Sequence, residues 1–393
     1  MHNLKPRRGI RFWSCYVLGM LTSLAMLCTI SYVVYYAVSH YLNPRRRYHL
    51  VNAPSGEDYF SLLMAPSDGS LGAYVVNTVV GGVQFRTLLD TGSSDAWFKS
   101  GAGGWPVNSP TFSSSPGGSY SIRYLGGSAT GSIGSDVLSM NGFSWQQNVG
   151  VITQLNMNFG ALVGILGISR GCDHLGLCAL EYWALNQTVL SFYYDSVNWQ
   201  GIFTAGFEDP GLYCAGDQTW LTLLSRTNSD LYYWAGLVDL EVNGQKVGSS
   251  KSAVFDTGTT YFYAIESVYN QVVNLVQGTS CAPPTVGFRI NNVFFRIPNS
   301  AYLQPNGGGR GPCNMRLYKF SNGGIGYDLL IGAVFLINYY VTFDIKNSRI
   351  GFCNPRPGVF SSTRRLQEHN SQLLHNLLAQ ERPGPAKIEG YHN

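Results

Sequence analysis

Two aspartates of this 393-residue chain stand in nearly the same seven-residue setting. Residues 88–94 read Leu-Leu-Asp-Thr-Gly-Ser-Ser, and residues 254–260 read Val-Phe-Asp-Thr-Gly-Thr-Thr. By average residue usage, one Asp-Thr-Gly string followed by a hydroxyl residue arises by chance in roughly one chain of this length in a hundred. Its occurrence at corresponding places in the two halves of the chain predicts a duplicated unit that carries Asp90 and Asp256.

Two carboxylates that meet at the interface between such units could catalyse hydrolysis. Neighbouring acids cannot both ionise at low cost, so they share one proton, and one stays protonated while the other remains a base. The base can activate a water molecule while the acid polarises a carbonyl group, which gives acyl hydrolysis without a covalent intermediate. Asp90 and Asp256 are therefore the predicted catalytic pair.

The residues that follow each aspartate are suited to hold its carboxylate. Gly92 and Gly258 let the backbone approach closely, and their amides can donate to the carboxylate. The hydroxyl groups of Ser93 and Thr259 can donate to its outer oxygen. These contacts would help to keep the two carboxyl groups coplanar.

Both aspartates are predicted to follow buried strands. Residues 73–90 contain two apolar, β-branched runs around Gly81-Gly82, which predicts a hairpin that ends at Asp90. Residues 119–140 alternate apolar and polar side chains on both sides of residues 125–128, which predicts a second hairpin with a glycine-bearing tip.

The second half of the chain repeats this style. Residues 237–256 and 328–352 again contain strands and turns, and an apolar-apolar-Gly segment follows each aspartate block, at residues 164–168 and 329–333. Only 12% of all residues are charged, whereas 46 Gly, 25 Tyr and 20 Phe suit strands joined by tight turns. The sequence predicts a mostly-β protein with two lobes.

These motifs resemble those of the pepsin family of bilobal aspartic proteases. The resemblance covers residues 74–352 and rests on LLDTGSSDAW, VFDTGTT and the C-terminal LLIGAVFLINYYVTFDIKNSRIGF. It implies a mostly-β, bilobal, double-barrel fold and an aspartic endopeptidase that needs no cofactor. Asp90 and Asp256 would be its dyad, and its partners would be protein or peptide substrates.

The resemblance also implies roles for residues around the dyad. Thr91 and Thr257 would cross-link the two loops beneath the carboxylates. Tyr124 and Gly126 would belong to a flap that closes over substrate, and Trp97 would be the hydrogen-bonding partner of the flap tyrosine. Cys281 and Cys313 resemble the disulfide pair of the C-terminal lobe.

The chain departs from the family pattern at several positions near the predicted site. Leu125 stands where the residue after the flap tyrosine is usually glycine, and Asp95 stands where asparagine is frequent. Gly82-Val83 replaces a common Pro-Pro turn. None of these changes removes a catalytic group, but they affect the expected flap and substrate preference.

Two other readings remain as alternatives. The pepsin fold also serves in catalytically inactive binding or inhibitor proteins, because a fold does not fix activity. Loss of either aspartate would mark such a protein, and both are present here. A retroviral-type enzyme supplies one Asp-Thr-Gly per subunit, whereas the two copies in this chain predict an active site that is complete in a monomer.

The sequence offers few of the residues that other hydrolytic mechanisms and metal sites need. Cys172-Asp173-His174 with Cys178 lacks the paired spacing of zinc sites, so we expect a disulfide loop and no metal. His174 is the one histidine between residues 60 and 353. Serine and cysteine hydrolases need an imidazole beside the nucleophile, which disfavours both mechanisms.

The charge of the chain is unevenly distributed. Its net charge is +4, yet residues 60–353 hold 14 Lys and Arg against 17 Asp and Glu, so the positive charge belongs to the flanks. A nucleic-acid-binding domain needs a basic surface that neutralises phosphates. We therefore expect no nucleic-acid partner.

The N-terminal flank contains a candidate membrane segment. Residues 12–39 are an uncharged run of 28 residues, rich in Leu, Val, Ile, Met and aromatic side chains. This exceeds the roughly 20 residues that cross a bilayer core and the about 7–15 apolar residues of a cleavable signal peptide. We therefore predict a transmembrane signal-anchor over residues 12–42, with a cleavable signal peptide as the alternative.

Cysteine use predicts the side of the membrane on which the body lies. An even set of cysteines follows residue 60, compatible with disulfides in an oxidising compartment: Cys172, Cys178, Cys214, Cys281, Cys313 and Cys353. The triplet Asn186-Gln187-Thr188 is an N-glycosylation acceptor. We predict a single-pass membrane protein with a cytosolic N-terminus and a lumenal or extracellular body, in the secretory pathway, an endosomal or vacuolar compartment, or at the cell surface.

The predicted organisation follows from these assignments. Residues 1–11 are a cytosolic tail, and residues 43–59 are a stalk or short pro-segment. Residues 60–200 and 201–353 are the N-terminal and C-terminal lobes, and residues 354–393 are a polar, disordered tail.

Overall fold

The computed structural model of the chain describes a defined set of residues: 62–64, 74–140, 143–171, 176–180, 189–195, 200–206, 208–225, 233–276, 285–304, 314–320, 326–357 and 359. Several predictions fall outside these residues: the membrane span 12–42, the glycosylation site Asn186, Cys172, and the proposed pair Cys281 and Cys313. Within the described residues, no helix is long and apolar enough to cross a membrane.

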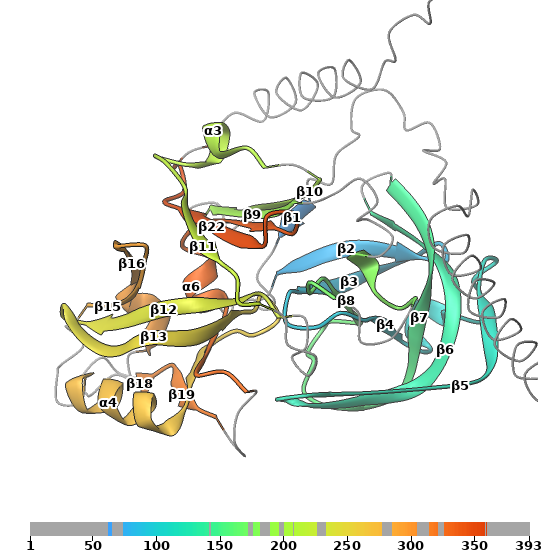
Figure 1. Cartoon of the computed structure of the whole chain (residues 1–393). Helices are drawn as coiled ribbons and strands as arrows, with labels where there is room; N and C mark the ends of the chain where they lie inside the picture. Colours follow the sequence, from blue (N-terminus) through green and yellow to red (C-terminus); the bar gives the residue numbers. More distant parts are fainter. Residues whose placement is uncertain are drawn as a thin grey trace, which may run out of the picture. The chain divides into compact units, whose positions relative to one another are not determined.

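The N-terminal lobe is built on a seven-stranded sheet with the order β2-β3-β8-β4-β7-β6-β5 (Figure 1). Its strands are β2 (Val75–Val80), β3 (Val83–Asp90), β4 (Ala96–Lys99), β5 (Ser113–Tyr124), β6 (Gly127–Met140), β7 (Phe143–Asn156) and β8 (Gly164–Gly167). A short 3₁₀ helix, η3 (Ala102–Gly104), follows β4. The predicted hairpins are confirmed, since β2 pairs with β3 around Gly81-Gly82 and β5 pairs with β6.

The C-terminal lobe contains a second seven-stranded sheet, with the order β16-β15-β12-β13-β20-β14-β19. Its strands are β12 (Ala235–Val242), β13 (Gln245–Phe255), β14 (Phe262–Ala264), β15 (Val286–Ile290), β16 (Val293–Ile297), β19 (Leu317–Lys319) and β20 (Leu329–Ile331). The lobe also holds α4 (Glu266–Val276), α5 (Asn299–Tyr302), α6 (Ala333–Leu336) and the small pair β17 (Leu303–Gln304) and β18 (Asn314–Met315).

The two lobes repeat one strand arrangement. In the first lobe β3 runs parallel to β8, β8 pairs antiparallel with β4, and β4 runs parallel to β7. The second lobe repeats this order: β13 runs parallel to β20, β20 pairs antiparallel with β14, and β14 runs parallel to β19. The duplicated unit predicted from the sequence is therefore confirmed at the level of strand topology.

A third sheet joins the lobes. It has six strands in the order β1-β10-β9-β21-β22-β11. These are β1 (Leu62–Met64), β9 (Val189–Asp195), β10 (Gln200–Ala205), β11 (Thr219–Thr222), β21 (Tyr340–Asp344) and β22 (Arg349–Cys353). The expected division between the lobes, after residue 200, falls within β10, directly after its first residue. Strand β10 pairs with β9, and β9 also pairs with β21.

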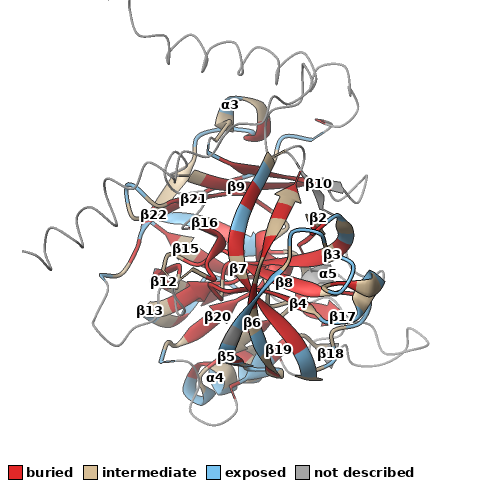
Figure 2. Cartoon of the chain, turned by 90° about the vertical axis from the view of Figure 1, so that its right-hand side faces the viewer, coloured by how far each residue is buried: buried red, intermediate tan, exposed pale blue. Residues whose placement is uncertain are grey.

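The core follows the central strands of each sheet. Every residue of β8 and β20 is buried, whereas β5 and the outer face of α4 carry exposed residues (Figure 2). The helix α4 buries Val268, Val272 and Val276, which are spaced four residues apart and share one face. The strands that end at the two aspartates are thus fixed within packed sheets.

The end of the last strand is tied to the preceding chain by a disulfide. Cys353, the last residue of β22, is bonded to Cys214, which follows α3 (Pro210–Tyr213). Beyond the disulfide, the guanidinium group of Arg356 donates to the carbonyl oxygen of Cys214 at 3.0 and 3.2 Å, and Val359 is buried in the same cluster. Residues 354–357 and 359 therefore belong to the folded body.

Candidate active site

The two predicted catalytic aspartates occupy matching positions in the two lobes. Asp90 is the last residue of β3, and Asp256 directly follows β13. Only 5% of Asp90 and 8% of Asp256 is exposed to solvent. Two loops start where the parallel strands end. They are residues 90–94, here called the Asp90 loop, and residues 256–260, here called the Asp256 loop.

Each carboxylate is held by the donors that the sequence predicted. The amide of Gly92 donates to Asp90 Oδ1 at 2.8 Å, and the amide of Gly258 donates to Asp256 Oδ1 at 2.7 Å. The hydroxyl group of Thr259 donates to Asp256 Oδ2 at 2.6 Å, and that of Ser93 donates to Asp90 Oδ2. The two carboxylates therefore have the same pair of partners, one amide and one hydroxyl.

The glycines of the two loops also bring the carboxylates together. A Cβ atom added to Gly92 would lie 2.5 Å from Cγ of Asp256, and one added to Gly258 would lie 2.2 Å from Oδ1 of Asp90. Each glycine thus packs directly against the aspartate of the opposite lobe. Any side chain at either position would collide with the facing carboxylate, which explains why glycine occurs in both blocks.

The threonines of the two loops connect the lobes beneath the carboxylates. The amide of Thr91 donates to Thr257 Oγ1 at 3.0 Å, and the amide of Thr257 donates to Thr91 Oγ1 at 2.9 Å. Each hydroxyl group in turn donates to the opposite strand, Thr91 to the carbonyl of Phe255 at 2.9 Å and Thr257 to that of Leu89 at 2.7 Å. This reciprocal set of hydrogen bonds is buried and fixes the two loops relative to each other.

The site holds a proton more strongly than an isolated carboxyl group. Burial, and then the neighbouring charge of Asp256, raise the pKa of Asp90 well above its ordinary value of 3.8. The hydrogen bonds from Ser93 and Gly92 act in the opposite direction on this pKa. Two carboxyl groups in one buried site therefore retain a proton at pH values where an exposed aspartate is ionised.

The hairpin of β5 and β6 carries the predicted flap residues. Residues 119–132 of this hairpin are here called the flap, with Tyr124 paired to Gly127 across the turn formed by Leu125 and Gly126. The indole Nε1 of Trp97 donates to the hydroxyl oxygen of Tyr124 at 2.7 Å. Burial and the charge of Asp90 raise the pKa of Tyr124.

One contact at the flap was not predicted from the sequence. The hydroxyl group of Tyr120 donates to Oδ2 of Asp95 at 3.1 Å, and Asp95 is completely buried. The available signal was the period of two along β5, since Tyr120 and Tyr124 are four residues apart and share one face. Which buried partner Tyr120 meets depends on long-range packing and has no local signature.

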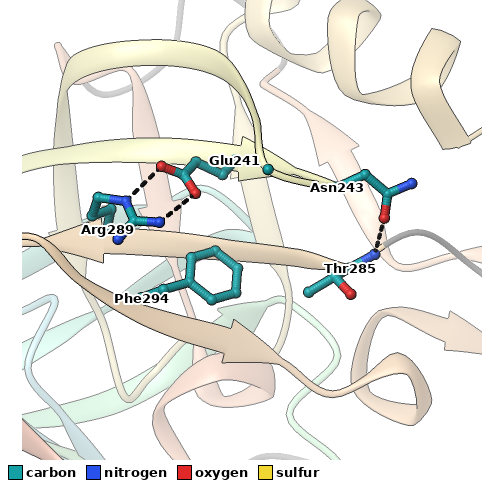
Figure 3. Close-up of a pocket in the computed structure, with 6 residues that line it drawn as sticks. Glu241, Asn243, Thr285, Arg289 and Phe294 are labelled. Carbon is teal, nitrogen blue, oxygen red and sulfur yellow. Dashed lines mark hydrogen bonds and ion pairs between the residues drawn. The ribbon is translucent and has the colours of Figure 1, made fainter.

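A separate pocket of about 360 Å³ lies in the C-terminal lobe, lined by Glu241, Asn243, Gly244, Thr285, Arg289 and Phe294 (Figure 3). Nε and Nη2 of Arg289 donate to the two carboxylate oxygens of Glu241 at 2.7 and 2.9 Å, and the guanidinium lies 5.7 Å from the Phe294 ring centroid. The charged groups of this pocket therefore bind each other. None of its lining residues belongs to the Asp90 loop, the Asp256 loop or the flap.

The chain is similar to known proteins along most of its length. The family model described as eukaryotic aspartyl protease matches residues 73–355. Gastricsin of Callithrix jacchus is 28% identical over 358 residues, which cover 80% of this chain and 88% of the relative. Penicillopepsin-1 of Talaromyces stipitatus is 28% identical over 313 residues, covering 71% of this chain and 77% of the relative.

An invertebrate relative extends this range of similar proteins. Aspartic protease 1 of Caenorhabditis elegans is 27% identical over 315 residues, covering 67% of this chain and 77% of the relative. The strand repeat, the matched aspartate loops and the family match over residues 73–355 lead to one conclusion: this chain belongs to the eukaryotic aspartyl protease family, a family of aspartic endopeptidases.

Proposed function

We propose that this chain hydrolyses peptide bonds of proteins with a water molecule activated between Asp90 and Asp256. The observation that carries the proposal is the matched setting of the two carboxylates. Each is buried, each accepts one amide and one hydroxyl donor, and each packs against the glycine of the opposite loop. The pair shares one proton, so an acid and a base are present together.

The reaction follows from this protonation state. The ionised carboxylate removes a proton from the water, whose oxygen attacks the carbonyl carbon of the peptide bond, while the protonated carboxyl group gives its proton to the carbonyl oxygen. The carboxyl group that took the water's proton then gives it to the nitrogen of the tetrahedral diol, while the other, now ionised, carboxylate takes a proton from a diol hydroxyl group and the carbon–nitrogen bond breaks. One carboxylic acid and one amine are released, and the pair again holds one proton.

Replacement of either aspartate tests this assignment. Asp90→Ala and Asp256→Ala should each reduce cleavage of an unstructured protein by at least about a thousandfold, because general acid and base catalysis are both lost. Cleavage is measured at acid and neutral pH, with and without a statine inhibitor that mimics the transition state. Asp217→Ala is the matched control, since Asp217 is an exposed aspartate outside both loops.

Two results would contradict the proposal. Activity that persisted unchanged in Asp256→Ala would exclude the paired-carboxylate mechanism. A folded parent protein that cleaves no protein or peptide would instead support the inactive pepsin-fold binding or inhibitor function.

We further propose that residues 12–42 anchor the protein in a membrane and that the protease body is lumenal or extracellular. The support is the uncharged run of 28 residues at positions 12–39, which is long enough to cross a bilayer.

The full chain should stay in the membrane fraction after alkaline carbonate extraction, whereas residues 43–393 should not. If the body is lumenal or extracellular, a glycosidase should lower the mass of the parent protein, and this mass shift should be lost in Asn186→Gln. Release of the full chain by carbonate would refute the anchor.

A further inference from the structure

Asp95 is a buried carboxylate next to the active site for which the proposed reaction has no use. It lies five residues after Asp90, directly before β4, and none of it is exposed. Its backbone forms a bridge with Cys178, and its carbonyl oxygen accepts the amide of Gly167 at 3.0 Å. The position of the Asp95 backbone is therefore fixed by the segments on both sides of it.

The partners of Asp95 differ from those of two other buried carboxylates of the described residues, Glu241 and Asp344. Glu241 and Asp344 each face an arginine on the same sheet, at 2.7 and 2.8 Å. The Asp95 carboxylate accepts hydroxyl groups from two elements of the candidate active site. Ser94, in the Asp90 loop, donates to Oδ1 at 3.1 Å, and Tyr120, in the flap, donates to Oδ2 at 3.1 Å.

The flap is thus attached to one short segment at two points. Tyr120 binds Asp95, and Tyr124 binds Trp97, two residues further along the chain. Tyr120 and Tyr124 are separated by about 13 Å along an extended strand, so the two contacts hold different parts of it. Asp95 holds the flap near its base, and Trp97 holds it near its turn.

The charge of Asp95 also acts on a flap residue near the Asp90 loop. Among the described residues, Tyr120 donates to this carboxylate and Tyr124 lies within reach of its charge. The sulfur of Cys178, which is disulfide-bonded, lies 4.0 Å from Oδ1. Both Asp90 and Asp95 raise the pKa of Tyr124. A negative charge at this place favours retention of a proton by neighbouring acids.

We propose that Asp95 is a positioning residue of the active site: its carboxylate fastens the base of the flap to the Asp90 loop, and its charge sets the pH range in which the aspartate pair holds one proton. This inference rests on the proposed protease function. The Asp95 side chain thus contributes a hydrogen bond and a charge, and a different substitution removes each of them.

Asp95→Asn tests the charge, because asparagine keeps the shape and one carbonyl acceptor. Both limbs of the pH profile of kcat/KM should move to lower pH, by about half a pH unit for a partly screened charge at this range. A purely structural role would lower activity without moving the limbs. Asp217→Asn, which removes an exposed carboxylate, should leave the profile unchanged.

Tyr120→Phe tests the hydrogen bond and leaves the charge in place. KM for a peptide substrate should rise about 3- to 10-fold, the equivalent of one hydrogen bond, while the limbs of the pH profile stay where they are. Tyr339→Phe is the matched control, since its hydroxyl group donates to the carbonyl of Arg296 at 2.6 Å, outside the flap. If Asp95→Asn fails to fold, the KM of Tyr120→Phe decides the question alone.

The failure of this inference differs from the failure of the proposed function. Unmoved limbs in a folded Asp95→Asn, or an unchanged KM in Tyr120→Phe, would overturn the role of Asp95 while the parent enzyme remained active and Asp256→Ala inactive. A folded parent without peptidase activity would overturn both.

Discussion

At the scale of single residues, the active site is defined by contacts that cross from one lobe to the other. Gly92 packs against Asp256, Gly258 packs against Asp90, and the two threonines exchange amide-to-hydroxyl bonds. Because both threonines are buried, the loss of either hydroxyl group would leave a polar backbone group without a hydrogen bond, at a cost of about 1–3 kcal/mol. The alignment of the carboxylates therefore depends directly on the threonine pair.

Thr257→Val should lower both stability and activity. Valine has nearly the shape of threonine but cannot donate to the carbonyl of Leu89 or accept the amide of Thr91, so the expected loss is about 2–4 kcal/mol in the free energy of unfolding. Chemical denaturation and kcat measure the two effects. Thr222→Val, on the exposed side of β11, is the control, and an equal effect of both substitutions would refute this role.

At the scale of elements, the flap is a hairpin in which the indole of Trp97 holds the residue directly before the turn. Leu125, in that turn, is 50% exposed although it is a large apolar residue, whereas Trp97 is fully buried. The hydrogen bond from Trp97 thus connects an exposed turn to the core of the N-terminal lobe. Its removal should affect the flap more than the fold.

Trp97→Phe should reduce kcat/KM up to about tenfold, because the donor to Tyr124 is lost while an aromatic ring remains. The matched control is Trp145→Phe, which removes the donor to Gln147 and a similar volume from a buried site on β7. Both variants should lose comparable thermal stability. A drop in kcat/KM of equal size in both would show that the cavity, and not the flap contact, is responsible.

The sequence predicted the elements that local pattern determines. The hairpins at residues 73–90 and 119–140 were predicted because alternation and glycine turns are local signals, and the two aspartate loops because their sequences repeat. The contact between Tyr120 and Asp95 and the disulfide between Cys214 and Cys353, 139 residues apart, were not predicted. Both depend on which distant strands pair, which no local pattern specifies.

At the scale of the whole molecule, the buried pair links stability to pH. Because the pKa of Asp90 is raised in the folded state, the folded protein binds more protons than the unfolded chain above the ordinary value of 3.8. The contribution of this group to stability is fully present below that pH and is lost as pH rises toward the folded-state pKa. The site therefore destabilises the fold at neutral pH relative to acid.

Asp90→Asn should remove this dependence. Its melting temperature relative to the parent protein should rise between acid and neutral pH, with each kcal/mol of gain worth about 1–2 °C for a protein of this size. Thermal unfolding at a series of pH values measures the difference, and Asp217→Asn should show no such trend. If the difference in melting temperature between Asp90→Asn and the parent protein stays constant with pH, the proposed link between Asp90 and pH-dependent stability is wrong.

The six-stranded sheet that joins the lobes has a consequence for synthesis on the ribosome. The N-terminal seven-stranded sheet is complete once residues 75–167 have emerged, and the pairings between its seven strands all lie within that stretch. The joining sheet combines strands from residue 62, from residues 189–222 and from residues 340–353. Since domains fold as their chain becomes available, β9 and β10 must wait with one open edge until β21 arrives, about 135 residues later. Translation of the final strand therefore also completes the framework that holds the two aspartates in one site.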